Sequence, residues 1–376
     1  MSDLTDLPDP TALPGVPHPR DTGLLIGQDA AERAFLDAYG SGRLHHAWMI
    51  TGPKGIGKAT LAYRIARFLL ATPPMEEDGL FGAPEPPTTL NIDPDHPVAR
   101  RMAAGSDPGL FVVKRSANDK GDRISAEIRI DDVRKLKSFF ALSSADGGRR
   151  VVIVDAADEM NTNAANALLK LLEEPPSGAF LLLIAHQPSR LLPTIRSRCR
   201  VLSCAPLAPD DLTQALRNAE VTITDAGALG ALAAGSVGAA VRLETQDGVQ
   251  LYGALVALFS GLPSVDRQLA LKLSETVAGR AGADRLTLLL DLLDLFLARL
   301  ARTGAGHAPT PEAVPGEAEV MRRLAPDAHA ARGWANLAQS LGNRARQGQA
   351  VNLDPSALLL DIVLKIEEQA RETLPA

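Results

Sequence analysis

Apolar and polar residues follow two alternating patterns through roughly the first 200 positions of the chain. Short, almost wholly apolar runs predict strands buried on both faces of a sheet, and these runs are AWMIT (47–51), LFVVKR (110–115), RRVVIVD (149–155) and AFLLLIAH (179–186). Amphipathic stretches lie between them and predict helices, as in 30–42 and 161–174. Together they predict an α/β fold with a doubly wound parallel sheet, whose ligands would lie at the carboxyl ends of the strands.

The pattern changes after about Leu207, where the strand signal stops. Short amphipathic stretches reach about Glu244, and longer helical stretches follow toward the C-terminus. The last of them has Asp354 at the cap position and Pro355 in the first turn, which is a typical helix start. Its apolar residues share one face, namely Leu358, Leu359, Ile362 and Ile366. We therefore predict that the second part of the chain is helical.

Two segments follow neither pattern. Residues 1–20 hold five prolines and little apolar periodicity, so we predict a flexible tail. Residues 71–120 contain a stretch rich in proline and acidic residues, which predicts an irregular insertion at the surface. Beyond it, Asp131 is the predicted cap of a helix in IDDVRKLKSFFALSS.

The composition narrows the classes of function. The 376 residues carry a net charge of −6, which argues against a surface coated with phosphate-binding basic residues. Two cysteines, Cys199 and Cys204, provide neither a disulfide framework nor a four-cysteine zinc site. The N-terminus lacks the features of a signal peptide, and no segment has the roughly 18 uninterrupted apolar residues of a membrane helix. We expect a cytoplasmic protein with reduced thiols and no membrane contact.

A glycine-rich loop, GPKGIGKAT, follows the apolar run at 47–51 and precedes a helix. In a phosphate-binding loop, backbone amides at a helix N-terminus face the phosphates and a lysine reaches the β- and γ-oxygens. The residues that fit this pattern are Gly52, Gly55, Gly57 and Lys58. A hydrolysing loop next needs a hydroxyl that ligates Mg²⁺, but Ala59 stands there and Thr60 comes one position late. A glycine-rich structural turn is the alternative interpretation.

A nucleotide site also needs an acid at the end of a neighbouring strand. Asp155 ends the run at 149–155 and could order Mg²⁺. Ala156 follows it, where a water-polarising glutamate would stand, and alanine cannot act as a base. Asp158 and Glu159 lie further on, where we expect them to open the next helix. We predict a phosphate cradle with little hydrolysis, and weak binding of ATP and Mg²⁺ through the loop lysine and threonine stays open.

Three stretches of this sequence together resemble the clamp-loader branch of the AAA+ proteins. They are LHHAWMITGPKGIGKATLA, NAANALLKLLEEPP and LLPTIRSRC, and IGQDAAERAF and NLDPSALLLDIVLKIEE also fit. Within that branch the sequence is most similar to the delta-prime subunits of the bacterial DNA polymerase III clamp loader, over roughly residues 22–370. The resemblance implies three domains: a P-loop α/β domain at 21–206, a helical lid at 207–247 and a helical collar at 248–376 that assembles a five-subunit ring.

The resemblance also implies a role for Arg198 outside its own subunit. In the family, the arginine of the Ser-Arg-Cys motif reaches across an interface to the γ-phosphate on a neighbour. A permanent cation with fork geometry suits the charge on a transferring phosphoryl group. Ser197 would position the loop, and Cys199 would be buried packing. On the residues alone, the alternative is that Arg196, Arg198 and Arg200 merely solvate a surface loop.

The sequence departs from the family at two further places. The lid helix of relatives begins G-S-x-R and brings an arginine to the nucleotide, whereas this chain has GSVGAAVR with Gly238 in the arginine's place. Many relatives carry four zinc-binding cysteines within roughly 71–125, where this chain has none, so zinc is not expected. His186 and Gln187 follow a strand where relatives place a phosphate-sensing residue, and that role is one hypothesis for them.

These features lead to one principal hypothesis and two alternatives. The chain would join ATPase (gamma/tau) subunits and a delta subunit in a hetero-pentameric ring that loads the sliding clamp onto primer-template DNA during replication. It would be neither a polymerase nor an efficient ATPase, and it would supply Arg198 in trans. The alternatives are an active gamma/tau-type ATPase that uses Thr60 and Asp155 for Mg²⁺, and an adaptor that uses only its collar. Direct DNA contact has the weakest support, because lysines on predicted helices are usually just exposed; the candidates are Lys135, Lys137 and Lys170.

Overall fold

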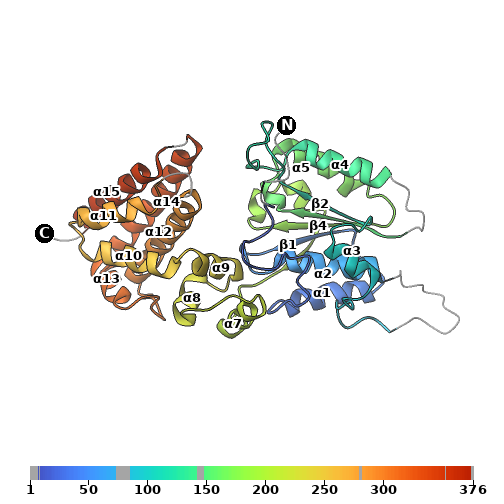
Figure 1. The fold of residues 1–376 in the computed structure, drawn as a ribbon, viewed down its shortest axis with the longest axis horizontal. Helices are drawn as coiled ribbons and strands as arrows, with labels where there is room; N and C mark the ends of the chain where they lie inside the picture. Colours follow the sequence, from blue (N-terminus) through green and yellow to red (C-terminus); the bar gives the residue numbers. More distant parts are fainter. Residues whose placement is uncertain are drawn as a thin grey trace. The chain divides into compact units, whose positions relative to one another are not determined.

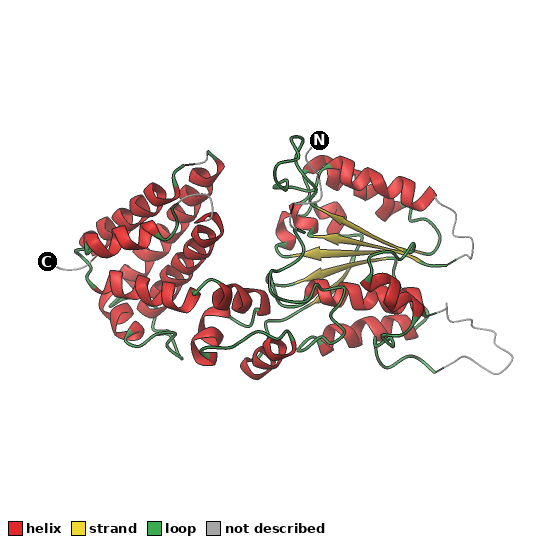
Figure 2. Cartoon of the chain, in the orientation of Figure 1, coloured by secondary structure: helices red, strands yellow, loops and turns green. Residues whose placement is uncertain are grey.

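The computed structural model describes residues 7, 9–72, 85–141, 148–278, 282–351 and 353–373. The chain forms two compact units. One consists of residues 1–220 with 235–238, and the other of residues 221–234 with 239–376. Among the described residues, all strands belong to the first unit and the second is helical (Figures 1 and 2).

The first unit is built on a five-stranded sheet in which all neighbouring strands are parallel. The order is β2-β3-β4-β1-β5, and the strands are β1 (Ala47–Thr51), β2 (Leu110–Lys114), β3 (Arg150–Asp155), β4 (Ala179–Ala185) and β5 (Arg200–Ser203). The four apolar runs form β1 to β4, which confirms the predicted parallel α/β fold. The pattern does not predict β5, because only one of its four residues, Leu202, is buried.

Helices cover both faces of this sheet, as a doubly wound fold requires (Figure 1). One face carries α4 (Ile130–Ala141) and α5 (Thr162–Glu173), and the other carries α1 (Asp29–Gly40), α2 (Lys58–Ala71) and α3 (Pro97–Ala103). Leu136 of α4 and Leu168 of α5 are buried in one apolar cluster with the strand residues Val152 and Leu181. The unit also contains α6 (Pro193–Arg196), α7 (Pro209–Asn218) and two 3₁₀ turns, η1 (Ala157–Glu159) and η2 (Pro188–Arg190).

The predicted irregular insertion at 71–120 is wrong at 97–103, which form α3, because Pro97 and the His96 side chain start a helix and its residues Val98 and Met102 are buried. The same range also includes β2, which the apolar run at 110–115 does predict. Residues 73–84 of the insertion lie outside the described residues. The predicted cap is also displaced: the backbone N–H of Arg129 donates to Asp132, while Asp131 lies within the first turn of α4.

Residues 9–20, expected to belong to a flexible tail, pack against the α/β unit. The Asp9 carboxylate forms an ion pair with Lys114 at the end of β2. The His18 ring lies edge-on to Tyr63, with 5.7 Å between the ring centroids, and Arg67 donates to the carbonyl of Arg20 at 2.6 Å. Proline limits the number of conformations open to the segment, so ordering it costs less entropy than ordering an ordinary coil.

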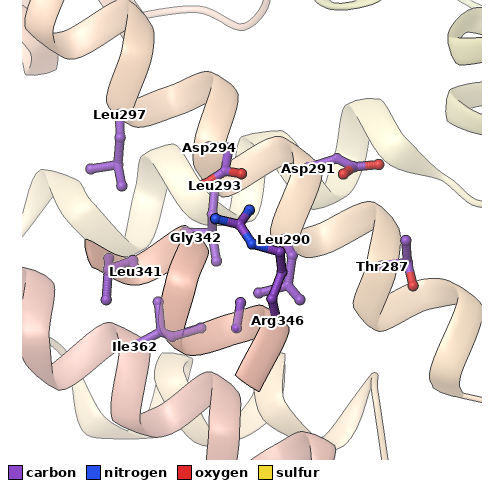
Figure 3. Close-up of a pocket in the computed structure, with 11 residues that line it drawn as sticks. Thr287, Leu290, Asp291, Leu293, Asp294, Leu297, Leu341, Gly342, Arg346 and Ile362 are labelled. Carbon is purple, nitrogen blue, oxygen red and sulfur yellow. The ribbon is translucent and has the colours of Figure 1, made fainter. Parts of the chain in front are cut away.

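The second unit contains the helices α8 (Ala226–Ala233), α9 (Val237–Thr245, whose first two residues cluster with the other unit), α10 (Gly248–Ser260), α11 (Arg267–Glu275), α12 (Ala283–Gly304), α13 (Glu317–Leu324), α14 (Ala328–Ala350) and α15 (Pro355–Thr373). As predicted, α15 begins after Asp354, whose carboxylate accepts from the N–H of Ala357. The Glu317 carboxylate is fully buried and accepts from Tyr252 and Arg299. A cavity of about 130 Å³ lies among α12, α14 and α15, with Asp294 and Arg346 on its wall (Figure 3).

The predicted division into three domains stays a prediction. The two compact units divide the predicted lid at 207–247, since α7 clusters with the sheet and α8 with the later helices. Every helix among the described residues is too short or too polar to cross a bilayer.

Candidate functional site

The glycine-rich loop connects the end of β1 to the start of α2, as the sequence predicts. Three of its glycines have the positive φ angles that side chains disfavour: 137° at Gly52, 79° at Gly55 and 97° at Gly57. A Cβ atom at Gly52 would lie only 2.5 Å from the carbonyl oxygen of Cys204. The loop therefore requires glycine for both its conformation and its close packing.

The side chain of Lys58 folds back onto this loop. Its ammonium donates to the carbonyl of Gly52 at 2.7 Å and also to the carbonyl of Pro53. The residue is only 3% exposed, and burial lowers the pKa of its ammonium to about 8. The lysine expected to reach phosphate oxygens thus serves carbonyl oxygens of its own loop.

Residues at the start of α9 cover the middle of the loop. The Ser236 hydroxyl donates to the carbonyl of Lys54 at 2.8 Å, and the N–H of Gly238 donates to the carbonyl of Gly55 at 2.9 Å. A Cβ atom at Gly238 would lie 3.0 Å from the Cα atom of Gly55. Gly238 is therefore in backbone contact with the loop, and a larger side chain at this position would have to displace the loop.

The N-terminal segment packs beside the same loop, at the edge where the strands end. Leu25 lies so close to Gly57 that a Cβ atom on the glycine would be 2.7 Å from the leucine methyl group. Leu13 lies beside Gly238 in the same way, at 3.3 Å. Figure 1 draws this segment in dark blue alongside the sheet. Groups of the chain itself thus surround the loop from two sides.

Asp155 ends β3 beside Lys114 of β2, its partner in the parallel register. Burial, and then the neighbouring Glu159, raise the pKa of the Asp155 carboxyl to about 6, although Lys58 opposes this shift. Among the described residues, its carboxylate forms neither a hydrogen bond nor an ion pair. Thr60 lies in the first turn of α2, and its hydroxyl likewise has no hydrogen-bond partner there. These are the groups a magnesium ion would need.

Asp158 has a structural task that the sequence did not reveal. Its carboxylate accepts from the N–H groups of His186 and Gln187, at 2.9 and 3.0 Å, and so ties η1 to the end of β4. Asp158 therefore does not open the next helix as predicted; α5 begins at Thr162 and is capped by Asn161. Burial, together with the positive charge of Lys58, lowers the pKa of His186 to about 4, so this imidazole is neutral at pH 7.

Arg198 lies in the turn between α6 and β5 and is held by two contacts. One Nη atom donates to the carbonyl of Thr194 at 3.0 Å, and the other lies 2.7 Å from an oxygen of Glu173 at the end of α5. The arginine side chain is still 36% exposed. Ser197 also donates to the carbonyl of Thr194, at 3.1 Å, which fixes the turn.

Cys199 packs against the apolar cluster under α5, and burial raises the pKa of its thiol to about 12. The thiol is thus protonated at pH 7 and serves packing, as predicted. Within the described ranges, no three His, Cys, Asp or Glu side chains come together in a way that could hold a metal ion.

Part of this chain is similar to known proteins. Residues 27–208 match the family model described as DNA polymerase III, delta subunit. The delta-prime subunit of Pseudomonas aeruginosa DNA polymerase III is 42% identical over 159 residues, which are 42% of this chain and 43% of that protein. Over residues 27–208, this chain is similar to the delta-prime family of DNA polymerase III subunits.

Other known proteins also match part of the chain. The Escherichia coli delta-prime subunit is 34% identical over 61% of this chain and 64% of its own length. A gamma/tau subunit of Mycobacterium tuberculosis is 30% identical over 48% of this chain and 28% of its own length. The matches thus span about two fifths to two thirds of the delta-prime relatives. A gamma subunit-related protein from Thermotoga maritima aligns in structure over 90% of this chain, with a TM-score of 0.41 and 16% identity.

The motifs that resemble delta-prime subunits contain some residues of the candidate site and miss others. One motif contains the loop glycines and Lys58, and another contains Arg198. Each motif spans only a few neighbouring residues. They do not identify Glu173 as the partner of Arg198, although it belongs to the quoted NAANALLKLLEEPP stretch. The sequence does contain one signal for this pair, which is an acidic residue at the end of the helix that precedes the Ser-Arg-Cys turn.

Proposed function

We propose that this chain is a delta-prime-like subunit of a DNA polymerase III clamp loader. It assembles in a hetero-pentameric ring with gamma/tau ATPase subunits and a delta subunit, and works in the cytoplasm where the ring loads the sliding clamp onto primer-template DNA. Its match to the family model over residues 27–208 and its similarity to a delta-prime subunit support this role. The proposal assigns the chain no polymerase activity of its own.

In this proposal the chain acts chemically through Arg198, in the site of a neighbouring subunit. The observation that carries it is the contrast between a loop lysine bonded to its own loop and an arginine that keeps an exposed guanidinium. A guanidinium supplied across an interface stabilises the charge on a transferring phosphoryl group, and a comparable finger contributes about 10³–10⁵ to the rate in small GTPases. Ser197 supports the finger by fixing its turn.

The proposal gives the chain's own nucleotide loop a minor role. Lys58 and the loop backbone already bond to groups of the same chain, so ATP and Mg²⁺ bind weakly or not at all. The proposal includes no zinc.

The decisive experiment is ATP hydrolysis by the reconstituted loader with clamp and primed DNA, comparing wild type with Arg198→Ala. A large fall in rate with intact assembly supports the proposal. An unchanged rate would leave this chain as an adaptor that acts only through its helical second unit.

The second candidate is an active ATPase of gamma/tau type. The similarity to gamma/tau subunits favours it, as do the carboxylate of Asp155 and the hydroxyl of Thr60, which lack partners in the described structure. It requires steady hydrolysis by the purified chain, abolished by Lys58→Ala.

A further inference from the structure

The ion pair between Arg198 and Glu173 connects two elements that the family motifs treat separately. Glu173 is the last residue of α5, and its carboxylate oxygen lies 2.7 Å from an Nη atom of Arg198. A carboxylate at a helix C-terminus is unfavourable with respect to the helix dipole, so α5 itself gives no reason for an acid there. The adjacent Glu174 is exposed, and no ion pair or hydrogen bond of its side chain occurs among the described residues. Of these two neighbouring acids, only Glu173 holds the arginine.

The contacts of Arg198 restrain the guanidinium without using all of its donors. A guanidinium has five N–H groups in a rigid plane. One Nη atom donates to the Thr194 carbonyl, and the other forms an ion pair with Glu173. The guanidinium has no further hydrogen bond or ion pair among the described residues, so N–H groups remain for an incoming anion. Two anchors on different Nη atoms fix both the place and the plane of the group, so it does not have to be ordered when a phosphate arrives.

We propose that Glu173 is a positioning residue, which orients the Arg198 guanidinium toward a phosphoryl group bound by the neighbouring subunit. This inference rests on the proposed function, because it needs Arg198 to act in trans. The side chains of Glu173 and Arg198 are 47% and 36% exposed, and half-exposed ion pairs contribute little to folding stability. Loss of Glu173 should therefore change the rate of hydrolysis much more than the stability of the chain.

The experiment uses the loader reconstituted with its ATPase subunits, delta subunit, clamp and primed DNA. Glu173→Ala should lower kcat for ATP hydrolysis by about tenfold, because the finger is misplaced but still present. The KM for ATP should be unchanged, since the nucleotide is bound by another subunit. Glu173→Asp should recover part of the loss. Glu174→Ala removes the same charge one residue away and should behave as wild type.

The double variant Glu173→Ala/Arg198→Ala should be no slower than Arg198→Ala alone, because Glu173 acts only through the arginine. Thermal unfolding and size-exclusion chromatography establish that each variant folds and assembles. If Glu173→Ala does not assemble, Glu173→Gln takes its place, since it keeps the side-chain volume and one acceptor oxygen but lacks the charge.

The outcomes separate the two proposals. If Arg198→Ala leaves the rate unchanged, the proposed function fails. If Arg198→Ala slows hydrolysis while Glu173→Ala matches or exceeds wild type, only the positioning role is overturned. An equal loss in Glu173→Ala and Glu174→Ala would also overturn it, because the effect would then come from general negative charge.

Discussion

The glycine-rich loop and the Arg198 turn belong to the same α/β unit, yet their cations face opposite kinds of surroundings. Lys58 is 3% exposed and donates to two carbonyls of its own loop. Arg198 is bonded on one side only, and the side chain keeps a third of its surface exposed. A cation whose donors are satisfied inside the fold contributes to structure, whereas one with free donors at the surface can contribute to a site completed by another molecule.

This contrast explains why the loop alone is a poor guide to function. A phosphate entering the loop would have to compete with the carbonyls that hold Lys58, and with the contact between Gly55 and Gly238. A phosphate approaching Arg198 would meet N–H groups that have no partner among the described residues. We therefore expect the turn that carries Arg198 to matter more for the proposed function than the glycine-rich loop.

The largest expected effect comes from substituting Arg198 and Lys58, one at a time, in the reconstituted loader. Arg198→Lys keeps the charge but loses the planar fork, and hydrolysis should fall by about 10²-fold. Lys58→Ala should change the rate little, because that lysine serves its own loop. The measurement is steady-state ATP hydrolysis with clamp and primed DNA. The reverse result, a silent Arg198→Lys and an inactive Lys58→Ala, would identify a gamma/tau-type ATPase instead.

Asp155, at the end of β3, should make the stability of the chain depend on pH. Its pKa is raised to about 6 from an ordinary 3.8, so the native state holds a proton more tightly than the unfolded state does. Stability should therefore fall as pH rises from about 4 through about 6. Asp155→Asn removes this fall and should stabilise the chain at pH 7.5 by up to about 3 kcal/mol, with no gain near pH 3.5. Urea unfolding at both pH values measures the effect.

Asp158→Asn is the matched control for that measurement. Asp158 lies three residues away, but its carboxylate accepts two backbone N–H groups, and an amide offers only one acceptor oxygen. The substitution should therefore destabilise the chain at pH 7.5, by about 1–3 kcal/mol. If both variants shift stability in the same direction, the difference between the two carboxylates is not the cause.

Sequence patterns predict local features of this molecule well and long-range contacts poorly. The apolar runs of β1, β3 and β4 and the turn glycines are visible because each is defined within a few residues. The pairing of Asp9 with Lys114 joins positions 105 residues apart, and nothing near Asp9 in sequence indicates it. For the same reason the Glu173–Arg198 pair and the contact of Gly238 with Gly55 emerge only from the fold. The pattern does not predict the short strand β5, because exposed side chains are as typical of a loop.

The contact between Gly238 and the glycine-rich loop can be tested with two glycines that differ in their surroundings. Gly238→Ala places a Cβ atom 3.0 Å from the backbone of Gly55, so the loop contact has to shift and the chain should lose about 1–2 kcal/mol. Gly230 lies within α8 with no atom within 4 Å of an added Cβ. Gly230→Ala should therefore stabilise by about 0.5–1 kcal/mol. Chemical denaturation of both variants compares them, and equal effects would contradict close packing at Gly238.

The smallest expected effect concerns the N-terminal segment that packs beside the loop. Burial by itself would raise the pKa of the Asp9 carboxyl. The hydrogen bonds from Lys114 and Thr11 outweigh burial and hold this pKa at about 2, below its ordinary 3.8. The stabilisation is fully present above pH 3.8 and should disappear as pH falls toward 2. Because the pair is partly exposed, Asp9→Asn should cost less than about 1 kcal/mol at pH 6 and nothing near pH 2. Asp37→Asn, at an exposed position of α1, should have no effect at either pH. An Asp9→Asn variant as stable as wild type at pH 6 would show that this contact does not hold the segment. The glycine-rich loop would then be more accessible to a phosphate than the burial of Lys58 indicates.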